Sequence, residues 1–182
     1  NFTNEKNTKA VIYIVRDPRN LITSVSHHYS MNLEKSYNFM INNQQMTMVN
    51  KWGSNEFGIA SVLGSWATHY KSWKNIKFAK ILLIKYEDLI NDTNKTFKSI
   101  LDFLSKFMII KIDEEKILNT VNSCEFKTLV KMENDKGFNE AIGSKKFFYL
   151  GKKNNWKNIL DPKIEQKIKK SFFKEMKELG YL

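Results

Sequence analysis

The chain of 182 residues has one cysteine, Cys124, and only 19 acidic residues against 30 lysines and arginines. A single cysteine excludes a framework of internal disulfide bonds and suits a reducing compartment, so we expect a cytoplasmic protein. No apolar run approaches the length that crosses a bilayer, and no secretory leader is visible. The sequence therefore predicts one domain with a hydrophobic core and no membrane span.

Several catalytic signatures are also missing. His27, His28 and His69 have no Cys, His or carboxylate partner at the spacing of metal ligands, so we expect no metal site. There is no Gly-x-Ser-x-Gly, which excludes a hydrolase built on a nucleophile elbow. No glycine-rich phosphate loop occurs before Ala10.

The charge is strongly one-sided. A formal net charge of +11 favours an anionic partner. The lysines are spread along the whole chain, and no zinc-ligand spacing or RNA-binding signature accompanies them. We therefore expect no nucleic-acid partner, although a basic module that binds nucleic acid or another anion remains the alternative that charge alone would support.

One segment predicts where an anion would bind. Residues 10–15 are six apolar or aromatic residues in succession, typical of a strand buried in a parallel sheet. Arg16 follows at the carboxyl end, where open α/β sheets bind ligands. Asp17 can cap the next helix and Pro18 suits its first turn, so a helix N-terminus adds a positive field. Alternatively, Arg16 pairs with a carboxylate and Ser24 only solvates a helix face.

The remaining elements follow from hydrophobic periodicity and capping signals. We expect a second buried strand over 80–86, and loops over the polar segments 31–55 and 134–158. The expected helices cover 18–30, 57–74, a segment starting at Asp92 or Thr93, 113–121, 125–133, and a segment from Asp161-Pro162 to near Gly180. No repeat or linker divides residues 1–182.

A series of short motifs resembles one enzyme family. The first is Tyr13, Arg16, Pro18 and Ser24, with the serine eight residues beyond the arginine. The later motifs, in order, are Gly64-Ser65-Trp66, Tyr86-Glu87-Asp88-Leu89, Ser123-Cys124-Glu125-Phe126, Met132-Glu133, Gly137-Phe138, Gly151 and Trp156-Lys157. Their identity and order resemble the sulfotransferases that use 3′-phosphoadenosine 5′-phosphosulfate (PAPS).

The resemblance implies an α/β, P-loop-like, three-layer fold with a parallel sheet. The family's phosphosulfate loop, Pro-Lys-x-Gly-Thr-Thr-Trp on a strand–loop–helix, is not found in these residues, and the usual catalytic base also precedes the strand that corresponds to 10–15. We therefore expect a carboxyl-terminal portion of such a domain, with its catalytic residues upstream of Asn1. A divergent domain that lost those parts is the alternative, and a P-loop kinase-like phosphotransferase is another.

The resemblance also assigns the donor site residue by residue. Arg16 and Ser24 would hold the donor's 3′-phosphate, and Tyr86, Cys124 and Phe126 would lie around the adenine. For Cys124, simple packing is the favoured interpretation, because a free cysteine behaves as a small hydrophobe. For Glu87 and Asp88 we favour a structural role in capping the next turn.

The loop near Gly151 departs from the family pattern, which has Arg-Lys ahead of the glycine. Tyr149 and Leu150 stand there instead. Either Lys152 and Lys153 restore the charge, or the loop contributes only backbone N–H groups.

The implied reaction moves a sulfuryl group from PAPS to a hydroxyl or amine, without a metal, and leaves adenosine 3′,5′-bisphosphate (PAP). We expect a small molecule, a glycan or a lipid as the acceptor, since no signature in 31–55 identifies one.

Overall fold

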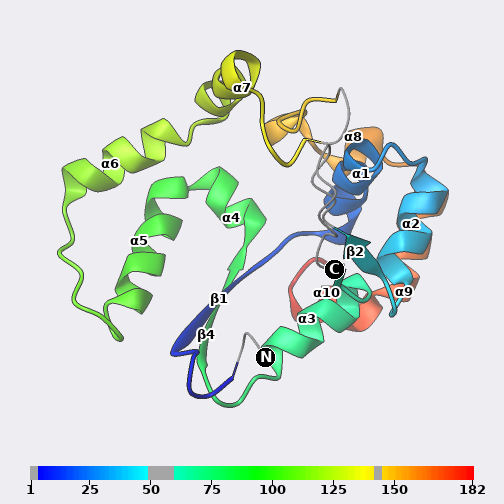
Figure 1. Ribbon diagram of the computed structural model, residues 1–182. Coiled ribbons are helices and arrows are strands. Elements are labelled where there is room, and N and C mark those ends of the chain that lie inside the picture. The colour runs from blue at the N-terminus through cyan, green and yellow to red at the C-terminus, as the bar shows by residue number, and fades with distance from the viewer. Residues whose placement is uncertain (1–3, 49–59, 142–144) are drawn as a thin grey trace. The chain divides into compact units, whose positions relative to one another are not determined.

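A computed structural model describes residues 4–48, 60–141 and 145–182 of the chain (Figure 1). The chain divides into two compact units, and each is assembled from two separate stretches of sequence. The first unit comprises 1–17 and 76–155, and the second comprises 18–75 and 156–182.

The first unit is built on a pair of parallel strands, β1 (Ala10–Val15) and β4 (Lys80–Lys85). Their register places Ala10 opposite Lys80 and Val15 opposite Lys85. The other elements are α4 (Tyr86–Asn91), α5 (Thr93–Leu104), α6 (Glu114–Ser123), α7 (Phe126–Lys136) and the 3-10 turn η1 (Gly151–Lys153). Helices α4 and α5 contact β4, and α6 contacts α5, so the helices are layered outward from the sheet (Figure 1).

The helix starts in this unit follow from short polar side chains. Asp92 accepts a hydrogen bond from the Lys95 backbone N–H at 3.1 Å and caps α5, which confirms the predicted start. Asp113 caps α6 through the Lys116 N–H at 3.1 Å. The helices expected over 113–121 and 125–133 are found as α6 and α7.

The second unit is mainly helical, with one antiparallel strand pair. Its elements are α1 (Pro18–His28), α2 (Leu33–Ile41), β2 (Met46–Met48), β3 (Ala60–Val62), α3 (Trp66–Lys74), α8 (Trp156–Ile159), α9 (Pro162–Ser171) and α10 (Phe173–Glu178). Most of its buried side chains come from α1, α2, α3, α9 and α10, and include Ile22, Met40, Tyr70, Ile168 and Met176. The Trp66 and Phe172 rings pack with centroids 5.1 Å apart.

The first turn of α1 is fastened to the C-terminal end of the chain within this unit. The buried Arg19 donates to the Tyr181 carbonyl at 2.7 Å, and its guanidinium lies 4.1 Å from the Trp156 ring centroid. The side-chain oxygen of Asn20 accepts from the Trp156 N–H at 2.8 Å. Arg19 is thus committed to structure within the second unit.

The parallel strands are less buried than predicted. Along β1, Val11 and Val15 are buried, whereas Ile12 and Ile14 are 36% and 49% exposed. Successive side chains of a strand point to opposite faces, so β1 has one covered face rather than two. The predicted strand 80–86 ends one residue early, because Tyr86 is the first residue of α4.

The loop expected over 31–55 is wrong for its described part. Residues 33–41 form α2, which Asn32 caps by accepting from the Lys35 N–H at 2.8 Å, and residues 46–48 form β2. The many Asn and Gln residues of this segment favoured a loop, but part of it forms a short helix that buries Ser36 and Met40. Residues 49–55 lie outside the described part of the chain.

The helix expected over 57–74 begins only at Trp66. Gly64 has a φ of +67°, a conformation that a helix cannot continue through, and Ser65 caps α3 by accepting from the Thr68 N–H at 3.1 Å. Residues 60–62 form β3 instead, and 57–59 lie outside the described residues.

Three further boundaries differ from expectation. The helix from Asp161-Pro162 is divided at the buried Phe172 into α9 and α10. The helix expected over 18–30 ends at His28. The segment 134–158 is not all loop, since it contains the end of α7, η1 and α8.

Glu178 ties α3 to α10. Its Oε1 accepts a hydrogen bond from the Tyr70 hydroxyl at 2.9 Å and forms an ion pair with Lys74. The hydrogen bond from Lys74 holds the pKa of Glu178 below the ordinary value of 4.5. The ionised form is therefore favoured in the folded protein, so this contact stabilises the fold above about pH 4.5 and is lost as the pH falls through the lowered pKa.

We accordingly expect Glu178→Gln to lower the melting temperature at pH 7, with an effect that diminishes toward pH 3 as the Glu178 carboxylate becomes protonated. The measurement is the melting temperature of both proteins across this range. Glu115→Gln, at an exposed position of α6, is the control and should change the melting temperature little at any pH. A Glu178→Gln effect that is the same at pH 3 and pH 7 would contradict the assignment.

Candidate functional site

The parallel register brings Arg16 and Tyr86 together. Arg16 follows Val15 at the end of β1, and Tyr86 follows Lys85, the residue opposite Val15 in β4. The guanidinium carbon of Arg16 lies 4.3 Å from the centroid of the Tyr86 ring. A cation over an aromatic face at this distance is attracted to the ring, and the ring limits the planes the guanidinium can adopt. The strand register and the Tyr86 ring thus orient a planar cation at the carboxyl edge of the sheet.

Glu87 holds the backbone next to this cation. Its Oε1 accepts a hydrogen bond from the N–H of the buried Asp17 at 3.0 Å. The carboxylate thus fixes the residue after Arg16, in addition to any part in capping its own turn. Sequence reasoning missed this contact, although Asp17 and Glu87 each stand two residues beyond the ends of the paired strands β1 and β4.

Tyr13, the first residue of the Arg16 motif, has a partly buried phenol. Burial raises the pKa of Tyr13 to about 12, because removal from water disfavours the phenolate. The Tyr13 side chain therefore stays neutral at any physiological pH and adds no negative charge to β1.

Ser24 lies on α1, half-buried, in the second unit. Its assignment continues to rest on the eight-residue spacing from Arg16 in the sequence.

Cys124 ends α6, where its backbone N–H donates to the carbonyls of Thr120 and Val121 at 3.3 and 3.1 Å. Its side chain is exposed. The packing interpretation of Cys124 is therefore wrong: the residue stands at a helix end on the surface of the first unit.

Phe126 and Gly151 are in close contact. Phe126 is the first residue of α7, and Gly151 opens η1 with a φ of +53°. A Cβ atom placed on Gly151 would come within 2.9 Å of the Phe126 ring, closer than real contacts allow. Glycine is thus required here both by φ and by space. The Lys152 and Lys153 side chains that follow are exposed.

Glu133 is part of the Met132-Glu133 motif, but its contacts were not predicted from the sequence. Its carboxylate accepts from the backbone N–H groups of Phe147 and Phe148 at 2.5 and 3.1 Å. The sequence contained only a weak signal, namely an acidic residue two helical turns after Phe126.

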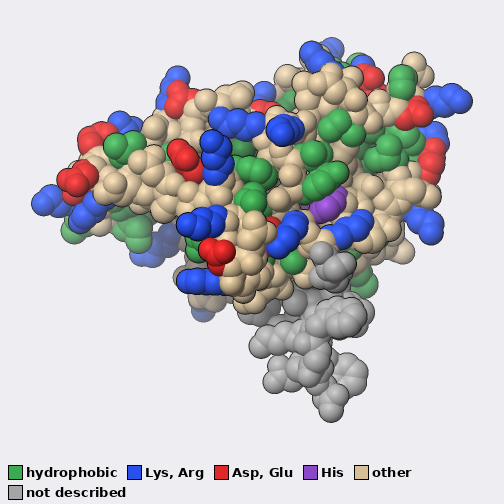
Figure 2. Space-filling view, turned by 90° about the horizontal axis from the view of Figure 1, so that it is seen from above, with side chains coloured by type: hydrophobic (Ala, Val, Ile, Leu, Met, Phe, Trp, Pro, Cys, Tyr) green, Lys and Arg blue, Asp and Glu red, His purple; other side chains and the backbone are tan. Residues whose placement is uncertain are grey.

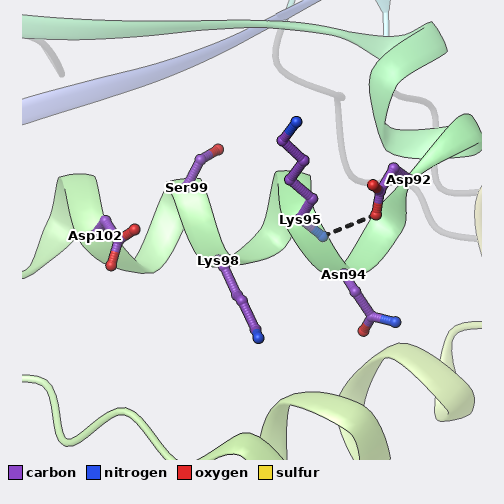
Figure 3. Close-up of a pocket in the computed structure, with 6 residues that line it drawn as sticks. All are labelled: Asp92, Asn94, Lys95, Lys98, Ser99 and Asp102. Carbon is purple, nitrogen blue, oxygen red and sulfur yellow. Dashed lines mark hydrogen bonds between the residues drawn. The ribbon is translucent and has the colours of Figure 1, made fainter.

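A shallow pocket lies along α5, away from the predicted residues of the site (Figure 3). It is lined by Asp92, Asn94, Lys95, Lys98, Ser99 and Asp102. Asp92 caps the helix, and Lys98 forms an ion pair with Glu114 at 2.6 Å. The lining side chains come from one helix, and Lys95 and Lys98 point in different directions (Figure 3), so we assign no binding role to this pocket.

The basic side chains are dispersed. On the face seen in Figure 2, Lys and Arg side chains are scattered, with Asp and Glu among them. Within the described ranges, no cluster of three or more His, Cys, Asp or Glu residues is arranged to hold a metal ion. None of the described helices is both long enough and apolar enough to span a bilayer.

These features define an α/β protein in which an arginine stacked on a tyrosine stands beside an ordered backbone turn at the carboxyl end of the parallel strands. The sequence matches the sulfotransferase domain family over residues 3–180, and the chain belongs to that family. The resemblance drawn from the motifs is thereby confirmed.

The chain is similar to several known sulfotransferases. It is 29% identical over 153 residues to a 3-alpha-hydroxysteroid sulfotransferase of Cavia porcellus, covering 81% of this chain and 49% of the relative. It is 30% identical over 145 residues to sulfotransferase 2A1 of Rattus norvegicus, covering 78% and 45%. The chain thus spans about half the length of these relatives.

Solved structures show the same fold. Mouse sulfotransferase SULT7A1 complexed with PAP superimposes with a TM-score of 0.66 at 22% identity, covering 94% of this chain and 59% of that one. A retinol dehydratase in complex with retinol and PAP gives 0.64 at 21% identity, covering 95% and 49%. The expected α/β fold with a parallel sheet is confirmed.

The contact between Gly151 and Phe126 predicts a coupling between two substitutions. Gly151→Ala should destabilise the protein, because the new methyl group meets the Phe126 ring and because φ is positive. Phe126→Ala should remove the steric part of this destabilisation. The double variant should therefore be more stable, by about 1 kcal/mol or more, than the sum of the two single-variant effects predicts. Urea unfolding of the four proteins measures this coupling.

Gly137→Ala is the control for backbone strain. Gly137 also has a positive φ, +73°, but a Cβ atom there would meet nothing within 4 Å. Its cost should therefore be independent of Phe126→Ala. If Phe126→Ala coupled equally to Gly151→Ala and to Gly137→Ala, the Phe126 ring would not be what restricts the side chain at position 151.

Proposed function

We propose that the whole protein transfers a sulfuryl group from PAPS to a hydroxyl or amine acceptor. Within it, residues 1–182 supply the side of the donor site that holds the 3′-phosphate and the adenine. The observation that carries the proposal is the Arg16 guanidinium, stacked on Tyr86 at the carboxyl edge of the parallel strands of a sulfotransferase domain. Membership of this family favours the sulfotransferase over the kinase-like alternative.

Arg16 is the principal phosphate ligand in this proposal. A guanidinium offers parallel N–H donors that match two phosphate oxygens, and Tyr86 holds its plane. Because Glu87 fixes the backbone at Asp17, the strand end does not need to reorganise when the phosphate arrives. Ser24 adds a hydroxyl donor to the same phosphate on the basis of its spacing from Arg16.

The adenine side is formed by Tyr86, Cys124 and Phe126. The Phe126 ring is 39% exposed, so it presents aromatic surface that a base can cover. Gly151 sets the following turn against this ring, and Lys152 and Lys153 restore the charge that Tyr149 and Leu150 do not supply.

In the proposed reaction the acceptor oxygen or nitrogen attacks the sulfur of PAPS, the bond from sulfur to the bridging phosphate oxygen breaks, and PAP leaves with that electron pair. The protein aligns donor and acceptor and neutralises charge on the leaving nucleotide. The acceptor's proton passes to a base that we place outside residues 1–182. We propose a small hydroxyl-bearing acceptor, since one relative is named for a hydroxysteroid and one similar structure contains retinol.

The assignment of Arg16 predicts selective nucleotide binding by the whole protein. PAP at about a hundred times its Kd should stabilise the fold by roughly 2.7 kcal/mol, and adenosine 5′-monophosphate at the same concentration should stabilise it much less. Arg16→Ala should remove the difference between the two nucleotides. A thermal-shift titration with both ligands measures it.

Lys106→Ala is the matched control, because it removes one positive charge from an exposed position on another part of the first unit. Its preference for PAP should equal that of the wild type. Equal responses of the wild type to the two nucleotides would contradict the proposed function.

The altered loop gives a separate prediction. Replacing Lys152 and Lys153 together by Ala should weaken PAP binding by about 1.5–3 kcal/mol for each charge-assisted hydrogen bond that the lysines make to the phosphate. Isothermal titration calorimetry on the wild type and the double variant measures the change. An unchanged Kd would show that the turn contributes only backbone groups and that Arg16 carries the phosphate charge.

A further inference from the structure

Glu133 is among the most buried acidic side chains of the described chain. It lies near the end of α7 and is 4% exposed. A carboxylate is rarely buried to this extent unless its oxygens are well hydrogen-bonded. Both oxygens are used: Oε1 accepts from the Phe147 N–H at 2.5 Å and Oε2 accepts from the Phe148 N–H at 3.1 Å. One carboxylate thus holds two successive backbone amides.

Side chains of the same segment also pack together. The rings of Phe138, Phe147 and Phe148 pack against one another, with centroids 4.6 to 5.2 Å apart. The Glu133 side chain is itself buried, and a hydrogen bond to a charged group is stronger where the dielectric constant is low. The segment at 147–148 is consequently fixed to α7.

The held amides lie directly before the turn assigned to the phosphate. Phe148 precedes Gly151 by three residues, and its ring contacts Phe126 in an edge-to-face arrangement with centroids 6.4 Å apart. The Phe126 ring in turn limits Gly151. A continuous series of contacts therefore runs from the Glu133 carboxylate through Phe148 and Phe126 to Gly151.

We propose that Glu133 is a positioning residue for the donor nucleotide. The hydrogen bonds that it accepts from the Phe147 and Phe148 N–H groups place the Gly151–Lys153 turn so that Lys152 and Lys153 reach the 3′-phosphate. The inference rests on the proposed function and extends it. Glu133 touches no ligand in this account. It acts through the backbone, so its replacement should weaken recognition of the 3′-phosphate specifically.

The test is Glu133→Gln in the whole protein. Glutamine has the same size but offers one oxygen, and its amide group turns a donor toward the second N–H, so one hydrogen bond is removed. The quantity measured is the ratio of the Kd for adenosine 5′-monophosphate to the Kd for PAP, by calorimetry. We expect this ratio to fall by about tenfold or more, the size of one charge-assisted hydrogen bond.

A purely structural role would lower the melting temperature and leave this ratio unchanged, because the two nucleotides differ only at the 3′-phosphate. An unchanged ratio would therefore overturn the inference. Glu140→Gln is the matched control: it makes the same charge change at an exposed position near this loop and should retain the wild-type ratio. If Glu133→Gln does not fold, Glu133→Asp replaces it, since its shorter side chain keeps the charge and reaches only one of the two amides.

A second measurement tests whether Glu133 acts through the turn. In a protein that carries Lys152→Ala and Lys153→Ala, adding Glu133→Gln should change the ratio by less than about twofold. A full effect in that background would overturn the proposed route. If the wild type lacks a preference for PAP, the proposed function fails and this inference fails with it. If the wild type has the preference and Arg16→Ala removes it, but Glu133→Gln does not reduce it, only this inference fails.

Discussion

The parallel pairing of β1 with β4 is the constraint on which the candidate site depends. Because the strands run in the same direction and in register, the residues that follow them emerge at one edge. This pairing sets Arg16 over Tyr86 and allows Glu87 to reach the backbone of Asp17. A slip of two residues would keep every strand side chain on its face and still separate Arg16 from Tyr86 and Asp17 from Glu87. The site therefore depends on the register as much as on the residue types.

Helix α7 organises the other half of the site in the first unit. Phe126 and Glu133 are seven residues apart, close to two helical turns, so they lie along one side of the helix. One contact is steric, between the Phe126 ring and Gly151, and the other is polar, between Glu133 and two backbone amides. Helix α7 thus limits both how closely the loop over 147–151 can approach it and how far that loop can move away from it.

The parts of the fold that the sequence predicted well are those with a local signal. Residues 10–15 are apolar with polar neighbours, and Asp92 and Asp161-Pro162 are caps recognisable from residue type. The helix α2 was missed because its polar residues hid a narrow buried face, and the start of α3 was missed because apolar spacing continued through Gly64. Arg16 and Tyr86 were predicted from their motifs. Glu87 and Glu133 also belong to motifs, but their contacts were not predicted, since their partners are backbone N–H groups, which every residue other than proline carries and which no sequence pattern identifies.

The division of the chain into interleaved units has a consequence for its synthesis. Strand β1 is synthesised before its partner β4, which follows about 70 residues later. At ribosomal rates of about 5–20 residues per second, roughly 4–14 s pass before the edge of β1 that pairs with β4 can form its hydrogen bonds. An apolar strand in this state is a substrate for chaperones and for aggregation. We therefore expect the speed of translation between the two strands to affect how much of the protein reaches its native sheet.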